Sequence, residues 1–451
     1  MKIVIIGGAG VRTVLFIHGL IARYQQLGIK KVVLYDIAKE KLDVIGKLCS
    51  YVMARENAQF EVETSNDIRE ALQDADHVVT TLRVGNDHSR VIDEEVALSH
   101  GVIGQETTGA GGFSMAVRTI PVLVEYCKII KEIVPNAWIF NFTNPSGLVT
   151  QALRNLGFDK VIGICDAPSS TIIRMAKALE IDPNHMYVEF FGLNHLSWIG
   201  KVIFEGKDLL PELVNDEKFL SKVEEFNMFD FSLIKSMGYL PNEYLYYFYH
   251  REQAIDHIIK SGNSRGKNIE NINTLMMNEL LSIDMDANPE EALQTFLYYM
   301  ESRESSYMSI EANKEKNVTI EKGHLEIPDS MGYAGVMLDC IEALQTDESK
   351  QVILSVPNNG SMDGLEDSDV IEVTCNVSRK GFEPVHIGKI PEHMYVLVKT
   401  IKLYEKLTID AIMNKSPELA IRALTVHPLV FSYSLAKKLV DGYTKEYGGL
   451  L

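Results

Sequence analysis

The stretch Ile3-Val4-Ile5-Ile6-Gly7-Gly8-Ala9-Gly10-Val11 decides the fold of the first third of the chain. Its four consecutive β-branched residues are typical of a buried strand. The glycines that follow allow a tight turn and a close approach of the backbone to a pyrophosphate. The N-terminus of the next helix would add N–H donors and partial positive charge. The stretch therefore predicts a strand–turn–helix unit that binds a dinucleotide.

An acidic residue at the end of the next strand supports this prediction. Asp36 follows the apolar run Lys31–Tyr35, at the place where a carboxylate hydrogen-bonds a ribose. Its charge would repel the 2′-phosphate of NADP, so NAD is the expected cofactor. The expected cofactor-binding residues are Gly7, Gly8, Gly10, Val11, Arg12 and Asp36. Because the spacing is Gly-Gly-x-Gly rather than GxGxxG, a plain tight turn and a helix-capping Asp36 stay as the structural alternative.

Short apolar runs alternate with helical patterns through the first third of the chain. Strands are expected at Lys2–Ile6, Lys31–Tyr35 and residues 77–82, 137–142 and 160–164, and helices at residues 11–26, 38–56, 68–74 and 117–134. This alternation is typical of a parallel sheet with right-handed crossovers. The expected fold class is α/β, with a Rossmann-like, doubly wound parallel sheet in an N-terminal domain of residues 1–198.

The second half has a different pattern. Helical stretches dominate, and residues 351–357 and 370–377 are expected to form a strand pair around Asn358-Asn359-Gly360. We expect residues 199–451 to form a C-terminal α+β domain that packs on the strand ends of the first. Ligands of doubly wound sheets bind at those strand ends.

Composition restricts the partners. The formal charge of -18 argues against nucleic acid or an anionic membrane as the binding partner. The five cysteines form no CxxC pair, and no apolar stretch is long enough for a membrane span. The first residues are typical of a strand rather than of a signal peptide, so the expected location is cytoplasmic.

Two later strings place reactive side chains at the ends of apolar runs. They are Gly163-Ile164-Cys165-Asp166-Ala167-Pro168 and Gly192-Leu193-Asn194-His195-Leu196-Ser197-Trp198. Cys165 and His195 together are too few ligands for a structural zinc site, so a metal held by them would keep positions open for substrate. Asp166 is a candidate acid. The structural alternatives are an inert core cysteine, a buried structural histidine and an aspartate that caps a helix.

Tyrosines and arginines complete the set of candidates. Tyr244, Tyr246, Tyr247 and Tyr249 crowd one segment, and one of them could act as a base if a metal or cation lowers its pKa below about 10. Spacing alone does not select which one. Arginine suits bidentate capture of phosphate, and the candidates, near the expected strand ends or in the following domain, are Arg83, Arg90, Arg118, Arg251 and Arg265.

The assembled motifs resemble the NAD- and manganese-dependent glycosidases of glycoside hydrolase family 4. The matching strings are residues 104–112, 141–145, 163–168, 192–195, 240–247 and 358–360, in order over essentially the whole chain. The family is an exception to two-carboxylate glycoside hydrolysis. The resemblance implies NAD-dependent oxidation at C3 of the sugar, deprotonation at C2 by a tyrosine and elimination at C1. Mn²⁺ or another divalent metal stabilises the charge that develops, and the hydride finally returns to the sugar.

The resemblance also assigns residues by motif. Cys165 and His195 resemble the metal ligands, Tyr244 the base and Asp166 the general acid. Arg90 resembles the arginine that grips a sugar 6-phosphate. Further contacts to substrate or metal are implied for Glu106, Asn144, Asn194 and Arg265.

The implied substrate is a 6-phosphorylated disaccharide or glucoside. The Cys-Asp-Ala-Pro string resembles the 6-phospho-α-glucosidases, whereas residues 83–118 and 141–147 are closer to the β-acting group. We predict a 6-phospho-β-glucosidase by a narrow margin over a 6-phospho-α-glucosidase. The resemblance further suggests a homodimer or homotetramer. The alternative function is an NAD-dependent 2-hydroxy-acid dehydrogenase on a similar sheet.

Overall fold

A large mixed sheet runs through the protein. The computed structural model describes residues 1–312, 320–328 and 334–449. The strand order in this sheet is β13-β12-β11-β6-β5-β4-β1-β2-β3. Its first six strands along the chain are β1 (Lys2–Ile6), β2 (Lys31–Tyr35), β3 (Glu61–Ser65), β4 (His77–Thr80), β5 (Trp138–Asn141) and β6 (Val161–Gly163). These six are parallel, which confirms the predicted α/β class.

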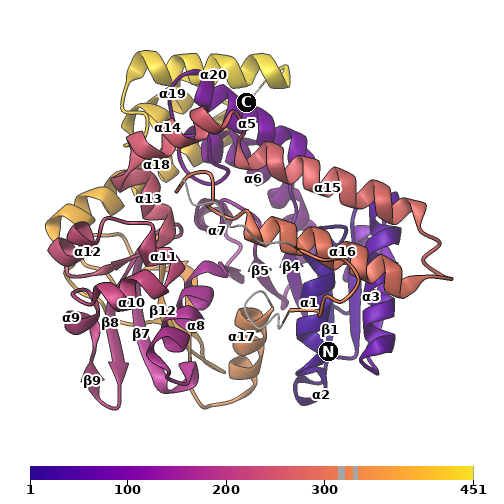
Figure 1. The fold of residues 1–451 in the computed structure, drawn as a ribbon. Helices are drawn as coiled ribbons and strands as arrows, with labels where there is room; N and C mark the ends of the chain where they lie inside the picture. The colour runs from indigo at the N-terminus through magenta and orange to yellow at the C-terminus, as the bar shows by residue number, and fades with distance from the viewer. Residues whose placement is uncertain (313–319, 329–333, 450–451) are drawn as a thin grey trace.

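Helices cover both faces of the parallel strands, as a doubly wound sheet requires (Figure 1). They are α1 (Thr13–Ile21), α2 (Tyr24–Leu27), α3 (Lys39–Arg55), α4 (Ile68–Leu72), α5 (Asn86–Ser99), α6 (Gly109–Ile133), α7 (Ser146–Asn155) and α8 (Ala167–Leu179). Three of these elements, β3, α5 and α7, were not predicted. β3 is an exposed edge strand without an apolar run, and α5 begins with a polar segment, so neither carries the expected periodicity.

Helix α6 begins eight residues before the predicted start at residue 117. Its first turn holds glycines, which lower helix propensity and hide the helix from a pattern search. The glycines are needed for close packing: a Cβ on Gly111 would lie 2.2 Å from the carbonyl oxygen of Gln105, and one on Gly112 would lie 2.4 Å from that of Thr107. The start of α6 is thus pressed against the loop that carries residues 105–107.

Strands from the second half extend the same sheet. The predicted strand pair is present as β11 (Lys350–Pro357) and β12 (Val370–Ser378), with β13 (Gly381–Pro384) at the edge. β11 joins β6 antiparallel through Ser355 and Gly163, so the sheet continues between the two regions. A second, antiparallel sheet contains β7 (Met186–Leu193), β8 (Leu196–Phe204), β9 (Lys207–Asp208) and β10 (Leu240–Pro241). The boundary expected after residue 198 lies within β8.

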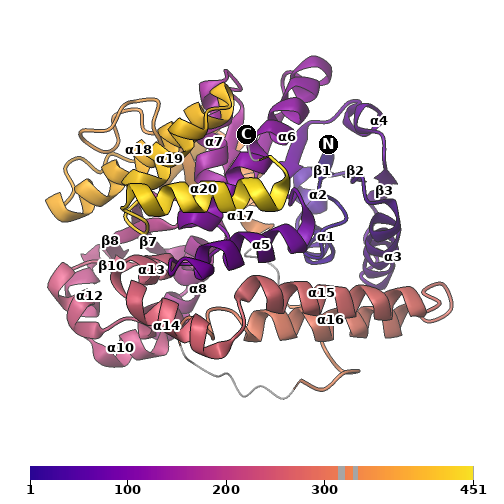
Figure 2. The same cartoon turned by 90° about the horizontal axis from the view of Figure 1, so that it is seen from above.

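The rest of the second half is helical. Its helices are α9 (Leu210–Leu213), α10 (Glu217–Lys222), α11 (Glu224–Asn227), α12 (Phe231–Met237), η2 (Glu243–Leu245), α13 (Tyr246–Tyr249), α14 (Arg251–Ser261), α15 (Arg265–Ser282), α16 (Pro289–Ser305), α17 (Gly335–Gln345), α18 (Glu392–Asn414), α19 (Pro417–Val426) and α20 (Tyr433–Tyr447), and a short turn η1 (Pro183–His185) precedes β7. Figure 2 shows α15 and α16 side by side, and α18 to α20 gathered near α5 to α7. No described helix is long and apolar enough to cross a membrane.

A buried histidine sits where the C-terminal helices pack together. His427 follows α19 and is 2% exposed, with its ring 4.5 Å from that of Tyr404 and 6.1 Å from that of Phe248. Its Nδ1 accepts a hydrogen bond from the backbone N–H of Leu429, so the imidazole is neutral in the fold. Burial lowers the pKa of His427 from 6.5 to about 3.

His427 should therefore make the folded protein sensitive to acid. Between pH 6.5 and 3, His427 binds a proton in the unfolded chain but not in the folded protein. The free energy of unfolding therefore falls as the pH falls. We expect His427→Gln to reduce the slope of unfolding free energy against pH by about 1.4 kcal/mol per pH unit in this window. Urea unfolding from pH 4 to 6 measures the slope, with exposed His393→Gln as the control. Equal slopes in the two variants would contradict the assignment.

Candidate active site

The glycine turn after β1 is shaped by close backbone contacts. Gly7 has a φ of +96°, and a Cβ there would lie 2.7 Å from the carbonyl carbon of Thr81 in the loop after β4. Asp36 lies beside the turn, with one carboxylate oxygen accepting from the N–H of Ala9 (3.1 Å) and the other from that of Ala38 (2.9 Å). Each oxygen keeps a lone pair for a ribose hydroxyl. The turn and Asp36 therefore fit a bound dinucleotide.

Arg12 connects the glycine turn to the second candidate string. Its guanidinium lies 2.9 Å from Asp166 and 3.4 Å from Glu304 at the end of α16. Asp166 occupies the N-cap position of α8, but its side chain makes no capping hydrogen bond. The Asp166 carboxylate pairs with Arg12 instead of accepting from the first N–H groups of the helix. The two residues thus link the expected cofactor site and the expected metal site.

Cys165 and His195 come together from different sheets. Cys165 follows β6 at the carboxyl edge of the parallel strands, as predicted. His195 lies in the two-residue turn between β7 and β8, with a φ of +62°, so the apolar run before it is a strand of the antiparallel second sheet. Its Nε2 lies 3.5 Å from the Cys165 sulfur. Ligand bonds of about 2.1 Å to nitrogen and 2.3 Å to sulfur fit such a separation around one ion.

A hydrogen-bond chain fixes the tautomer of His195. The Thr107 hydroxyl donates to the side-chain oxygen of Gln105 (2.9 Å), so the Thr107 oxygen accepts from Nδ1–H of His195 (2.7 Å). Nε2 then carries a lone pair that faces Cys165. Burial lowers the pKa of His195 to about 4, so the ring is neutral at neutral pH. A neutral imidazole oriented by a second hydrogen bond is the usual form of a metal-binding histidine.

The donor set fits a divalent metal with open positions. Burial, and next the charges of Glu372 and Asp166, raise the pKa of the Cys165 thiol well above its usual value. A nearby cation would reverse this effect and bind the thiolate. Over the described residues, no group of three or more His, Cys, Asp and Glu side chains forms a metal cage. Cys165 and His195 would therefore leave coordination positions for substrate oxygens.

Strand β12 fixes the turn that carries His195. Glu372 is 2% exposed and accepts hydrogen bonds from Asn194 Nδ2 and the Ser197 hydroxyl, both at 2.9 Å. The other end of the Asn194 amide accepts from the N–H of Gly147 at 3.3 Å. Asn194, predicted to contact substrate or metal, thus has both ends of its amide bound within the protein. Burial raises the pKa of Glu372 to about 7.

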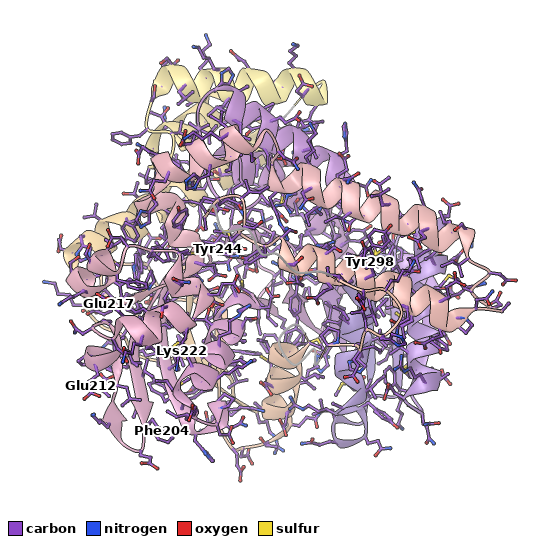
Figure 3. The ribbon with its side chains drawn as sticks, in the orientation of Figure 1. Phe204, Glu212, Glu217, Lys222, Tyr244 and Tyr298 are labelled. Atoms are coloured by element: carbon purple, nitrogen blue, oxygen red, sulfur yellow. The ribbon has the colours of Figure 1, made fainter. Side chains whose placement is uncertain are left out.

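Tyr244 packs against His195, one of the two candidate metal ligands. It lies in η2, where Asn242 caps the turn by accepting from the Tyr244 N–H at 2.9 Å. Its ring stacks on His195 with centroids 3.7 Å apart and planes within 11°. Burial, and next the charge of Glu243, raise the pKa of Tyr244 well above its usual value, so it needs a nearby cation to act as a base. Figure 3 shows Tyr244 near the middle of the molecule.

Arginines and carboxylates form a buried cluster next to this site. Arg90 is 8% exposed, and its guanidinium pairs with both Glu94 and Glu106. Arg83 also pairs with Glu106, at 2.8 Å. Burial alone would raise the pKa of Glu106, but Arg83 and Arg90 outweigh it and lower the value to about 2. The arginine predicted to grip a phosphate is therefore already paired with two carboxylates.

Two further arginines extend the cluster. Arg265, the first residue of α15, donates to the Arg303 carbonyl oxygen at 2.9 Å and to the Ser306 hydroxyl. Burial and the like charges of Arg12 and Arg265 lower the pKa of Arg303 to about 9. Nη1 of Arg83 and Nε of Arg303 are buried with no hydrogen-bond partner among the described residues. Buried, unpaired guanidinium donors are suited to an anionic ligand.

The predicted residues therefore gather in one region, with additions that the sequence did not reveal. Cys165 and Tyr244 contact His195, Asp166 follows Cys165, and, besides burial, the charge of Glu106 acts on the pKa values of His195 and Tyr244. The charge of Arg90 acts on Arg265, and Asn144 lies between β5 and α7, joined to Pro145 by a cis peptide bond. Sequence reasoning missed the roles of Thr107, Glu372 and Arg303. Thr107 lies in the matched string 104–112, which was the one available signal.

Comparison with known proteins agrees with this geometry. The model described as "Family 4 glycosyl hydrolase" matches residues 2–181, and "Family 4 glycosyl hydrolase C-terminal domain" matches residues 190–430. The chain belongs to family 4 of the glycosyl hydrolases. A probable 6-phospho-β-glucosidase of Bacillus subtilis is 30% identical over 98% of this family 4 chain and 95% of its own length.

Two solved structures resemble the whole fold. A 6-phospho-β-glucosidase from Thermotoga maritima, with manganese, NAD⁺ and glucose-6-phosphate, has a TM-score of 0.82 at 29% identity and covers 99% of this chain and 98% of its own. A 6-phospho-α-glucosidase from gut microorganisms, with NAD and glucose-6-phosphate, has a TM-score of 0.80 at 29% identity and covers 99% and 97%. Family 4 relatives of both anomeric types thus share this architecture.

The Thr107–His195 hydrogen bond gives a direct test of the metal site. We expect Thr107→Val to lower the affinity for Mn²⁺ about 10–100-fold, because the imidazole loses the partner that fixes its tautomer. Thr107→Ser keeps the hydroxyl and should bind Mn²⁺ like the parent protein. Titration of free Mn²⁺ by electron paramagnetic resonance measures the affinity. Equal affinities for the valine and serine variants would show that Thr107 does not orient a metal ligand.

Proposed function

We propose that this protein hydrolyses 6-phosphorylated glucosides through NAD-dependent oxidation at C3, deprotonation at C2 and elimination at C1. The observation that carries the proposal is the meeting of Cys165, His195 and Tyr244 at one point beside the glycine turn. Bound NAD would supply reversible oxidation at C3, and a divalent ion such as Mn²⁺ would supply electrostatic stabilisation of the sugar oxygens. Relatives solved with NAD, manganese and glucose-6-phosphate support the cofactor assignment.

Each residue of the site has a separate role in this proposed reaction. Gly7, Gly8, Gly10, Val11, Arg12 and Asp36 bind the dinucleotide, and Cys165 and His195 hold the metal. Tyr244 takes the proton from C2 through its phenol oxygen. Asp166 is the general acid that protonates the leaving-group oxygen; because its carboxylate pairs with Arg12 in this structure, it must first leave that pair and take up a proton. Glu106, Asn144 and Asn194 orient the sugar and the groups that surround it.

The arginine cluster supports a phosphorylated substrate. Arg83 and Arg303 each keep a buried donor without a partner among the described residues, and Arg265 lies against Arg303. Clustered guanidinium groups repel one another, so an anion between them is stabilising. We assign the 6-phosphate to Arg83, Arg265 and Arg303. Arg90 would contribute mainly by holding Glu106, unless substrate displaces one of its carboxylates.

For the anomeric preference we propose the β-linked substrate. Curated relatives at 30–31% identity act on 6-phospho-β-glucosides, by their descriptions, while those described as α-acting are 27–29% identical. The margin in identity is small, and the substrate assay below decides between the anomers.

We also propose that the protein is cytoplasmic and acts as a homodimer or homotetramer. Large apolar side chains stay exposed on neighbouring C-terminal elements: Val396, Leu403, Met413, Phe431 and Tyr433. Such a surface is suited to contact with a second copy. A cytoplasmic location follows from a substrate that is phosphorylated as it is imported.

The assay for the function uses wild-type protein with NAD, Mn²⁺ and, in parallel, a 6-phospho-β-glucoside and a 6-phospho-α-glucoside. We expect release of glucose-6-phosphate without accumulation of NADH, because the hydride returns to the sugar within each turnover. Activity should be lost with EDTA and be higher on the β-linked substrate. Steady accumulation of NADH without release of the aglycone would instead support the dehydrogenase alternative.

The phosphate assignment predicts a specific effect on substrate affinity. Arg303→Met removes a buried charge of the cluster, so we expect KM for the phosphorylated glucoside to rise about 10–100-fold, equivalent to about 1.4–2.7 kcal/mol. Arg69→Met is the control, because Arg69 pairs with Glu132 on the surface. Initial rates over a range of substrate concentrations measure KM. An unchanged KM in folded Arg303→Met would remove Arg303 from the phosphate site.

A further inference from the structure

A second tyrosine touches the proposed base. Tyr307 lies just after α16, and its hydroxyl oxygen is 3.1 Å from the hydroxyl oxygen of Tyr244 and 3.4 Å from Oε1 of Glu243. The three residues come from two segments about 60 positions apart. Tyr307 belongs to none of the motifs that marked the site in the sequence.

The contacts of Tyr244 with His195 and Asn242 do not fix the position of its phenol oxygen. Stacking on His195 fixes the plane of the ring, and the Asn242 cap fixes the backbone of the turn. Neither contact touches the phenol oxygen. Proton abstraction requires the oxygen itself to be held within hydrogen-bond reach of the proton. Among the described residues, the Tyr307 hydroxyl is in contact with it.

Tyr307 is itself held on two sides. Its ring lies 5.7 Å from the guanidinium carbon of Arg265, and its hydroxyl reaches Glu243. The next residues of the same turn contact the tyrosine segment as well, because the Tyr247 hydroxyl lies 3.3 Å from the Met308 sulfur and 3.2 Å from Oε1 of buried Glu311 and can donate to either. The turn after α16 is therefore fastened to the segment that carries the base at several points.

We infer that Tyr307 is a positioning residue for the reaction: its hydroxyl holds the phenol oxygen of Tyr244 in place, and Glu243 anchors Tyr307. The inference rests on the proposed function, in which Tyr244 takes the proton from C2. Tyr307 has one hydroxyl proton for two acceptors. It can donate to Glu243 while it accepts from neutral Tyr244, and it can donate to Tyr244 once that residue has lost its proton. The same contact thus fits both states of the base.

The test is Tyr307→Phe, which removes one oxygen and keeps the ring. We expect kcat to fall about 10–100-fold with KM within about twofold, since a hydrogen bond to a group that becomes charged is lost. The deuterium isotope effect with substrate labelled at C2 should increase, because C2 deprotonation becomes the slower step. NAD affinity and the thermal midpoint should stay at the wild-type values.

Tyr299→Phe is the matched control. Tyr299 also donates to a carboxylate, Glu279 at 3.0 Å, but from the body of α16 rather than beside Tyr244. This variant should keep the wild-type kcat and isotope effect. Glu243→Gln weakens the anchor of Tyr307 and should show the Tyr307→Phe signature at a smaller size. It keeps the test decisive if Tyr307→Phe fails to fold.

The outcomes separate the inference from the proposed function. Wild-type protein that neither shows a C2 isotope effect nor exchanges the C2 proton with D₂O would refute Tyr244 as base, and with it the proposed function. Exchange in the wild type, with unchanged kcat and isotope effect in the folded Tyr307 and Glu243 variants, would overturn only the positioning role. A loss expressed in KM or the thermal midpoint alone would likewise overturn it.

Discussion

The docking of the β7–β8 hairpin onto strand β12 is the contact on which the site depends. Thr374 of β12 donates to the Val188 carbonyl oxygen and accepts from the Phe190 N–H, both at 2.9 Å. Glu372, two residues earlier on the same face of β12, holds the two sides of the hairpin turn through Asn194 and Ser197. β12 is also part of the large sheet whose strand β6 leads to Cys165. One strand thus sets the position of His195 relative to Cys165.

Burial of charge accompanies this arrangement. Glu94, Glu106 and Arg90 lie in the interior, where an unpaired charge would be strongly destabilising. Arg90 pairs with both carboxylates. The pairing is incomplete at Arg83 and Arg303, whose buried donors lack partners among the described residues. A structure that leaves guanidinium donors unsatisfied loses stability there, and a bound phosphate would recover it. The cluster therefore connects the energetics of the fold to the choice of substrate.

The two proposed metal ligands, Cys165 and His195, and the proposed base, Tyr244, also depend on tertiary contacts. Thr107 at the start of α6 selects the His195 tautomer, His195 stacks on Tyr244, and Tyr307 contacts the Tyr244 oxygen. Each link joins a different part of the chain. A change at Thr107 or Tyr307 would leave Cys165, His195 and Tyr244 in the sequence, yet would remove a hydrogen bond to His195 or to Tyr244.

The sequence by itself predicted the parallel α/β sheet, the glycine turn with Asp36, and Cys165, His195 and Tyr244 as candidate reactive residues, with Tyr244 chosen through its family motif. These features are encoded by local periodicity and by short strings, which survive without knowledge of distant neighbours. Tertiary structure alone decided that β11 to β13 extend the first sheet, that His195 sits in a hairpin turn, and that Arg90 is paired with two carboxylates. It also supplied Thr107, Glu372 and Tyr307 as partners. The physical reason is that most of these contacts join residues tens to hundreds of positions apart, and only chain packing brings their polar atoms within hydrogen-bond distance.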